Sequence, residues 1–139
     1  MMKSNVGNSR SCEEAAIPKA KLLVVDEDPR DMCEYCGMLR ERGDDVHCVC
    51  SYAEGVACLG GESVDLVIVS QGSSAFEGRR VVERAIEKDR RIPVLVLARS
   101  VDMGCYLEAM QLGAFDYLEK PISATEILNL VTAHIRSRN

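Results

Sequence analysis

An apolar run that stops abruptly in acidic residues constrains the fold of this chain more than any other feature. The four consecutive apolar residues 22–25 suit a strand that is covered on both faces. Asp26 and Glu27 follow directly, at the carboxyl end of the strand, where open α/β sheets place their ligand sites. Asp28 and Pro29 are typical of a helix N-cap and the first helical position. The stretch therefore predicts a strand, an acidic site and a helix, in that order.

Length and composition fit one ordinary globular domain. The chain has 139 residues, of which 47% are hydrophobic and 28% charged, enough for one core. A net charge of −5 offers no basic surface for nucleic acid, and the apolar runs are too short to span a bilayer. Residues 1–19 lack the apolar segment of a secretory signal. We therefore expect a cytoplasmic protein with a flexible tail at 1–19, a domain at 20–138, and no direct contact with nucleic acid or membrane.

Strand and helix patterns alternate along the rest of the chain. Further strands are predicted at 46–50, 65–70, 93–97 and 114–118, and helices at 28–42, 51–59, 79–89, 103–112 and 123–136. This alternation predicts a doubly wound α/β fold with a five-stranded parallel sheet. The strand order 2-1-3-4-5 places the two most apolar strands, the first and third, at the centre. Asp26, Glu27 and Ser70 would then share one crevice.

Four motifs in this order resemble the receiver domains of bacterial response regulators, the CheY-like superfamily. They are LLVVDEDP at 22–29, DLVIV at 65–69, EG at 77–78 and GAFDYLEKP at 113–121. The resemblance covers residues 21–138. It implies the flavodoxin-like receiver fold and a role as a signal-transduction module of a two-component system, or phosphorelay.

The resemblance also implies roles for particular residues. In the family an acidic pair holds Mg²⁺, an aspartate ending the third strand accepts a phosphoryl group, and a lysine contacts that group. A hydroxyl ending the fourth strand also contacts it, and an aromatic residue on the fifth strand repacks in response. Asp26 and Glu27 match the acidic pair, Lys120 matches the lysine, and Tyr117 matches the switch aromatic.

Two positions depart from the family pattern. Ser70 stands at the phosphoacceptor position and Ala98 at the hydroxyl position. A neutral serine hydroxyl supplies neither the anionic oxygen nor the metal affinity of a carboxylate. We therefore predict a pseudo-receiver that is not an enzyme, holds Mg²⁺ weakly or not at all at Asp26 and Glu27, and needs no other cofactor. A receiver phosphorylated at another group is the alternative within signalling.

The helix predicted at 103–112 is broadly apolar. Met103, Leu107 and Met110 form a core-like stripe, flanked by Tyr106, and more apolar residues lie beyond it. Neighbouring elements cover these side chains, or they form a partner surface. Receivers commonly bind proteins through this fourth helix, the fifth strand and the fifth helix. The predicted face for a protein partner or a homodimer contains Tyr106, Met110 and Tyr117.

The alternative from a different class is a redox or metal-binding α/β protein that uses its cysteines. Cys33 and Cys36 have redox-motif spacing, but they lie inside a helix rather than at its amino end. Adding Cys48 and Cys50 gives a nominal zinc set, whose members would have to converge tetrahedrally. Because no secretion signal is evident, the seven cysteines are expected to be reduced thiols rather than a disulfide framework.

Other catalytic classes find little support. His47 lies on a predicted edge strand and His134 near the end of the last helix, so both are expected to be structural. The Gly-x-Ser-x-Gly pattern of a serine hydrolase is absent around Ser70.

Overall fold

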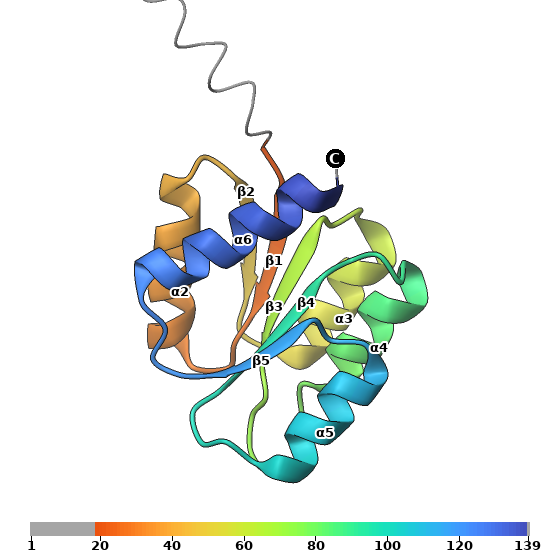
Figure 1. Ribbon diagram of the computed structural model, residues 1–139. Helices are drawn as coiled ribbons and strands as arrows, with labels where there is room; N and C mark the ends of the chain where they lie inside the picture. Colours follow the sequence, from red (N-terminus) through yellow and green to blue (C-terminus); the bar gives the residue numbers. More distant parts are fainter. Residues whose placement is uncertain (1–18, 139) are drawn as a thin grey trace, which may run out of the picture.

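The computed structural model describes residues 19–138, with side chains to residue 135, as five strands alternating with five helices (Figure 1). The strands are β1 (Lys21–Val25), β2 (Asp45–Val49), β3 (Leu66–Ser70), β4 (Val94–Ala98) and β5 (Asp116–Glu119). The helices are α2 (Pro29–Glu41), α3 (Tyr52–Gly61), α4 (Arg79–Lys88), α5 (Met103–Leu112) and α6 (Ala124–Arg138). Apart from Lys19, the tail predicted at 1–19 lies outside the described residues. None of the helices described is long and apolar enough to cross a membrane.

The five strands form one parallel sheet in the order β2-β1-β3-β4-β5, which confirms the predicted topology. β3 and β4 are buried along their whole length, as expected for central strands with helices on both faces. Val25 of β1 lies beside Val49 of β2 and Val69 of β3. Asp26 and Ser70, each one residue further along, therefore reach the same edge of the sheet.

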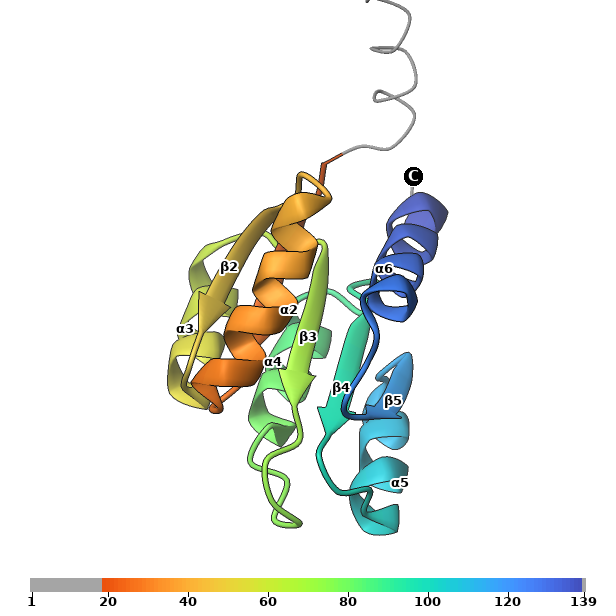
Figure 2. The same ribbon diagram turned by 90° about the vertical axis from the view of Figure 1, so that its left-hand side faces the viewer.

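Helices cover both faces of the sheet (Figures 1 and 2). Alternate residues of β1 point to opposite faces, because side chains in a strand have a period of two. Leu22 and Val24 pack into a core with α2 and α6, whereas Leu23 and Val25 pack into a core with α3, α4 and α5. The sheet therefore has a hydrophobic core on each of its two faces.

The helix ends follow the predicted capping chemistry. The Asp28 carboxylate accepts from the backbone N–H of Arg30 at the start of α2. Asp102 caps α5 in the same way, and Gly113 ends α5 in the left-handed conformation, with φ 112°. α3 continues through Gly61 rather than stopping at residue 59, since glycine weakens a helix without forbidding it.

The predicted buried stripe of α5 is wrong. Met103 and Leu107 are exposed, Met110 is half-buried, and Cys105 and Ala109 face the core instead. Periodicity alone did not identify the inward face, because nearly every face of this helix carries apolar residues. The small side chains of Cys105 and Ala109 face inward, whereas Met103 and Leu107 remain on the surface.

Candidate functional site

A buried ion pair lies where β1 and β5 end. The Lys120 Nζ lies 2.7 Å from Oδ2 of Asp26 and 2.9 Å from Oδ2 of Asp31. Lys120 and Asp26 side chains are only 6% and 4% exposed. Burial disfavours the charged ammonium, but the hydrogen bonds that it donates to both carboxylates, together with their negative charge, outweigh burial and raise the pKa of Lys120. The lysine is therefore a fixed cation between two acids.

Arg99 is a second cation at the same acids. Its Nη2 lies 2.7 Å from Oδ2 of Asp28 and 2.6 Å from Oδ2 of Asp31. The backbone N–H of Arg30, with help from Arg99, lowers the pKa of Asp28. Asp31 is thus shared between a buried lysine and an exposed arginine. The protein itself supplies positive charge to the acidic cluster, defined here as Asp26, Asp28 and Asp31.

Glu27 turns toward a different partner. The Tyr52 hydroxyl donates to Oε1 of Glu27 at 3.1 Å and also interacts with Ser70. Burial is the main cause that raises the pKa of Tyr52, so its hydroxyl stays protonated. Tyr52 therefore joins Glu27 to Ser70 through a neutral hydrogen-bonding group.

Tyr117 is held inside the domain by its hydroxyl. The hydroxyl donates to Oε1 of Gln71 and accepts from the backbone N–H of Asp102 at 3.1 Å. Burial raises the pKa of Tyr117, and its ring meets Tyr106 edge-on, with the centroids 5.5 Å apart. Gln71 is 2% exposed and directly follows Ser70. The end of β3, the start of α5 and β5 are therefore joined through one aromatic side chain.

Five of the site residues named from the sequence lie at this end of the sheet: Asp26, Glu27, Ser70, Ala98 and Lys120. Ala98 is buried at the end of β4, and its carbonyl accepts from the backbone N–H of Lys120 at 2.8 Å. Asp26 meets Lys120 directly, whereas Glu27 and Ser70 meet through Tyr52. The crevice that was predicted for Asp26, Glu27 and Ser70 therefore contains two separate sets of interacting residues.

Sequence reasoning missed four residues of the site, namely Asp31, Tyr52, Gln71 and Arg99. Gln71 and Arg99 each follow the last residue of a strand, so the rule that located Asp26 applies to them as well. Asp31 lies three residues after the N-cap of α2, on the turn that faces the site. Tyr52 has no comparable signal, because its direction depends on how α3 packs.

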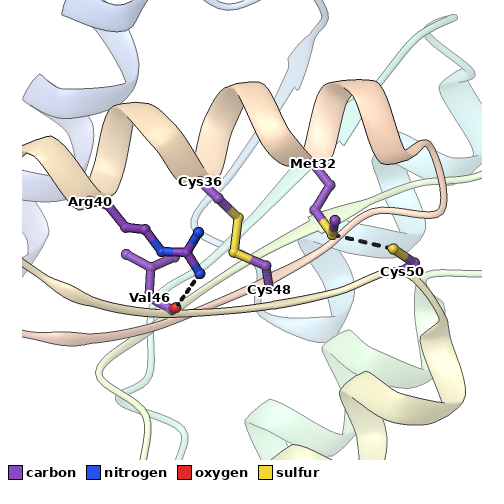
Figure 3. The surroundings of a disulfide bond; sticks show 6 residues. All are labelled: Met32, Cys36, Arg40, Val46, Cys48 and Cys50. Atoms are coloured by element: carbon purple, nitrogen blue, oxygen red, sulfur yellow. Dashed lines mark hydrogen bonds between the residues drawn. A yellow bond between two sulfur atoms is a disulfide. The ribbon is translucent and has the colours of Figure 1, made fainter.

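The sequence-based expectation of reduced thiols is wrong for two cysteines. A disulfide joins Cys36 of α2 to Cys48 of β2 (Figure 3). Cys33, the other member of the redox-like motif, is an exposed free thiol, and so is Cys50. The pairing follows the packing of a helix on a strand rather than spacing within one helix. In this state two sulfurs of the nominal zinc set are not thiolates.

The two histidines have ordinary packing partners. Nδ1 of His47, on the edge strand β2, lies 3.5 Å from Oε1 of Glu62 and 3.7 Å from Sγ of Cys58. Burial raises the pKa of the Cys58 thiol, which opposes its activation as a nucleophile. His134 stacks on Phe115 with ring centroids 3.8 Å apart. Each histidine therefore makes side-chain contacts within the fold.

Comparison with known proteins identifies the family of this chain. The family model for the response regulator receiver domain matches residues 22–132. Protein PilH of Pseudomonas aeruginosa is 29% identical over 117 residues, which cover 82% of this chain and 96% of PilH. Two-component response regulator-like APRR1 of Arabidopsis thaliana is 30% identical over 125 residues, 86% of this chain. The chain spans 20% of the length of APRR1.

Solved structures show the same fold. A CheY-like response regulator receiver domain protein from Methanospirillum hungatei JF-1 superposes with a TM-score of 0.81 at 18% identity, covering 87% of this chain and 97% of that one. A receiver domain protein from Clostridium thermocellum gives a TM-score of 0.77 at 25% identity, covering 86% and 96%. This chain belongs to the response regulator receiver domain family.

Proposed function

We propose that the chain is an atypical receiver that signals by binding a protein partner, or a second copy of itself, independently of phosphorylation. The observation that carries the proposal is Ser70, a buried hydroxyl at the end of β3 where the family has its acceptor carboxylate. A serine needs a base to become a nucleophile. Its neighbour Tyr52 has a raised pKa and stays protonated, so it does not serve as that base.

The arrangement of Tyr117 supports a fixed output. In a switchable receiver, a new charge at the end of β3 would bias the loops and the aromatic residue between two states. Here Gln71 and the backbone of Asp102 hold the Tyr117 hydroxyl without any added group. One arrangement is therefore favoured by the sequence itself.

The exposed apolar residues near α5 support the choice of binding face. Val101, Met103, Tyr106 and Leu107 are exposed, and Tyr106 contacts the ring of Tyr117. Large exposed apolar side chains that gather on one element are typical of protein interaction sites. The proposed face is formed by α5, β5 and α6 and contains Tyr106 and Met110, whereas Tyr117, which the sequence also placed on this face, is buried beneath Tyr106 and supports it.

Partner binding tests this proposal. Tyr106→Ala is expected to weaken capture of the partner from native cell extract several-fold, because it removes exposed aromatic surface. Tyr117→Ala should do the same by releasing the support beneath Tyr106, while Ser70→Ala should leave capture unchanged. Capture should also be indifferent to acetyl phosphate and Mg²⁺. If Ser70→Ala abolishes capture and both tyrosine variants keep it, the pocket controls binding and the proposal is wrong.

Magnesium binding is expected to be weak. Hard cations depend on anionic oxygen ligands, and the Ser70 position supplies none. The Asp26 carboxylate already accepts a hydrogen bond from Lys120, and the Glu27 carboxylate accepts one from Tyr52. Isothermal titration calorimetry should therefore show weaker Mg²⁺ binding in the unmodified protein than in Ser70→Asp. Equal, tight binding to both would contradict the proposed neutralisation of the site.

A further inference from the structure

Three side-chain interactions, which we call rungs, join α2 to the segment of β2 at regular spacing (Figure 3). The middle rung is the disulfide, and the outer two are hydrogen bonds. In chain order along the helix, the rungs are Met32 with Cys50, Cys36 with Cys48, and Arg40 with the carbonyl of Val46. Their members recur every four residues on the helix and every two residues at the strand.

This regularity follows from backbone geometry. Four helical residues rise about 6 Å, and two strand residues rise about 6.6 Å. Because these two rises are nearly equal, every fourth residue of the helix lies opposite every second residue of a strand that runs antiparallel to it. Three such pairs follow one another here. Cys36 and Cys48 meet because the two elements already pack in this register. The disulfide adds a covalent bond to a contact that the outer rungs also hold.

The surroundings of the disulfide suit reversible exchange. Cys36 is 1% exposed, whereas Cys48 is partly exposed on the edge strand β2, so a thiol in solution is expected to approach the disulfide from the side of Cys48. The disulfide spans only 12 residues of sequence, and it lies at the margin of the core that α2 and α6 form with the sheet, where Cys36 is a buried member and Cys48 packs against it. Reduced cysteines remain compatible with the site, since a thiol packs as a small apolar side chain.

The same helix carries part of the acidic cluster. Asp28 caps α2 and Asp31 lies on its first turn, where they bind Arg99 and Lys120. A bond that limits the movement of α2 against the sheet therefore also limits the movement of Asp28 and Asp31. We propose that Cys36 and Cys48 form a reversible dithiol–disulfide site, whose co-substrate is a dithiol and whose oxidation state sets how firmly α2 holds Asp31 against Lys120. This inference does not depend on the chemistry of Ser70.

Reduction proceeds by two exchange steps. A thiolate of the dithiol attacks Sγ of Cys48, a mixed disulfide forms, and Cys36 leaves as a thiolate that takes up a proton. The second thiol of the reductant then attacks its own sulfur in the mixed disulfide and releases Cys48, which is protonated in turn. Two electrons and two protons pass from the dithiol, which becomes a disulfide, to the cysteine pair. Oxidation by a small-molecule disulfide reverses these steps.

Differential alkylation of the folded protein tests the site. After treatment with oxidised glutathione, peptide mapping should find Cys36 linked to Cys48, and dithiothreitol should convert both to alkylatable thiols without unfolding the domain. Reduction is expected to lower the melting temperature by roughly 10 °C, because a constraint on the unfolded chain is lost. It should also speed hydrogen exchange in α2 while leaving α4 unchanged. Removal of the reductant with oxidised glutathione present should restore the starting values.

Two single variants distinguish this pair from the redox-like motif. Cys48→Ser should abolish the redox-dependent change in melting temperature, and Cys33→Ser, the matched control on the same helix, should retain it. The reverse pattern would show that Cys33 rather than Cys48 belongs to the redox-active pair and would overturn the proposal. So would a disulfide that dithiothreitol opens only on unfolding, or hydrogen exchange in α2 that is the same in both states.

Discussion

Ser70→Asp combined with Ala98→Thr is expected to take up a phosphoryl group from acetyl phosphate and Mg²⁺, whereas the starting protein keeps its mass. The aspartate supplies an anionic nucleophile and a third metal-binding carboxylate, and the threonine supplies a hydroxyl at the end of β4. Lys120 already lies at the same end of the sheet, with its charge secured by Asp26. Intact mass spectrometry over a time course measures the gain of one phosphoryl group.

The single variants provide the control for this experiment. Ser70→Asp alone should be modified more slowly than the double variant, and Ala98→Thr alone should not be modified. Ready phosphorylation of the starting protein would mean that another group accepts the phosphoryl, which would reverse the proposed function. If the double variant is not phosphorylated, Lys120 and Arg99, which pair with the acidic cluster, prevent the metal from binding there.

The fold was predictable because its signals are local. The unbroken apolar strands, the Asp28 and Asp102 caps and the glycine after α5 each determine backbone conformation within a few residues. Asp26 and Ser70 were placed at one edge because parallel strands end together.

The missed features depend on how separate elements pack. The inward face of α5 could not be read from periodicity, because apolar residues surround that helix. The Cys36–Cys48 disulfide depends on the register between α2 and β2, which the Cys33–Cys36 spacing does not report. The partners of Tyr52 and Arg99 likewise depend on side-chain directions set by tertiary contacts.

Lys120→Met is expected to lower the free energy of unfolding by about 3–5 kcal/mol, the usual cost of removing one partner of a buried ion pair. It leaves the buried Asp26 carboxylate without its cation. Arg99→Met is the matched control, because Arg99 binds the same Asp31 but is 64% exposed. An exposed pair contributes only about 0–1 kcal/mol. Urea denaturation of the three proteins measures the difference, and equal stability of both variants would show that Lys120 does not act as a buried counter-ion.

The pH dependence of the same variant gives a second test. Because Asp26 and Asp31 raise the pKa of Lys120, the folded state holds this proton more tightly than the unfolded state does. The stability that this difference contributes is fully present below the ordinary lysine pKa, about 10.4, and is lost as the pH rises above it. Lys120→Met should therefore show a shallower loss of stability on the alkaline side than the starting protein. Identical alkaline slopes would mean that the ion pair does not hold the proton, and that the acidic cluster is neutralised in another way.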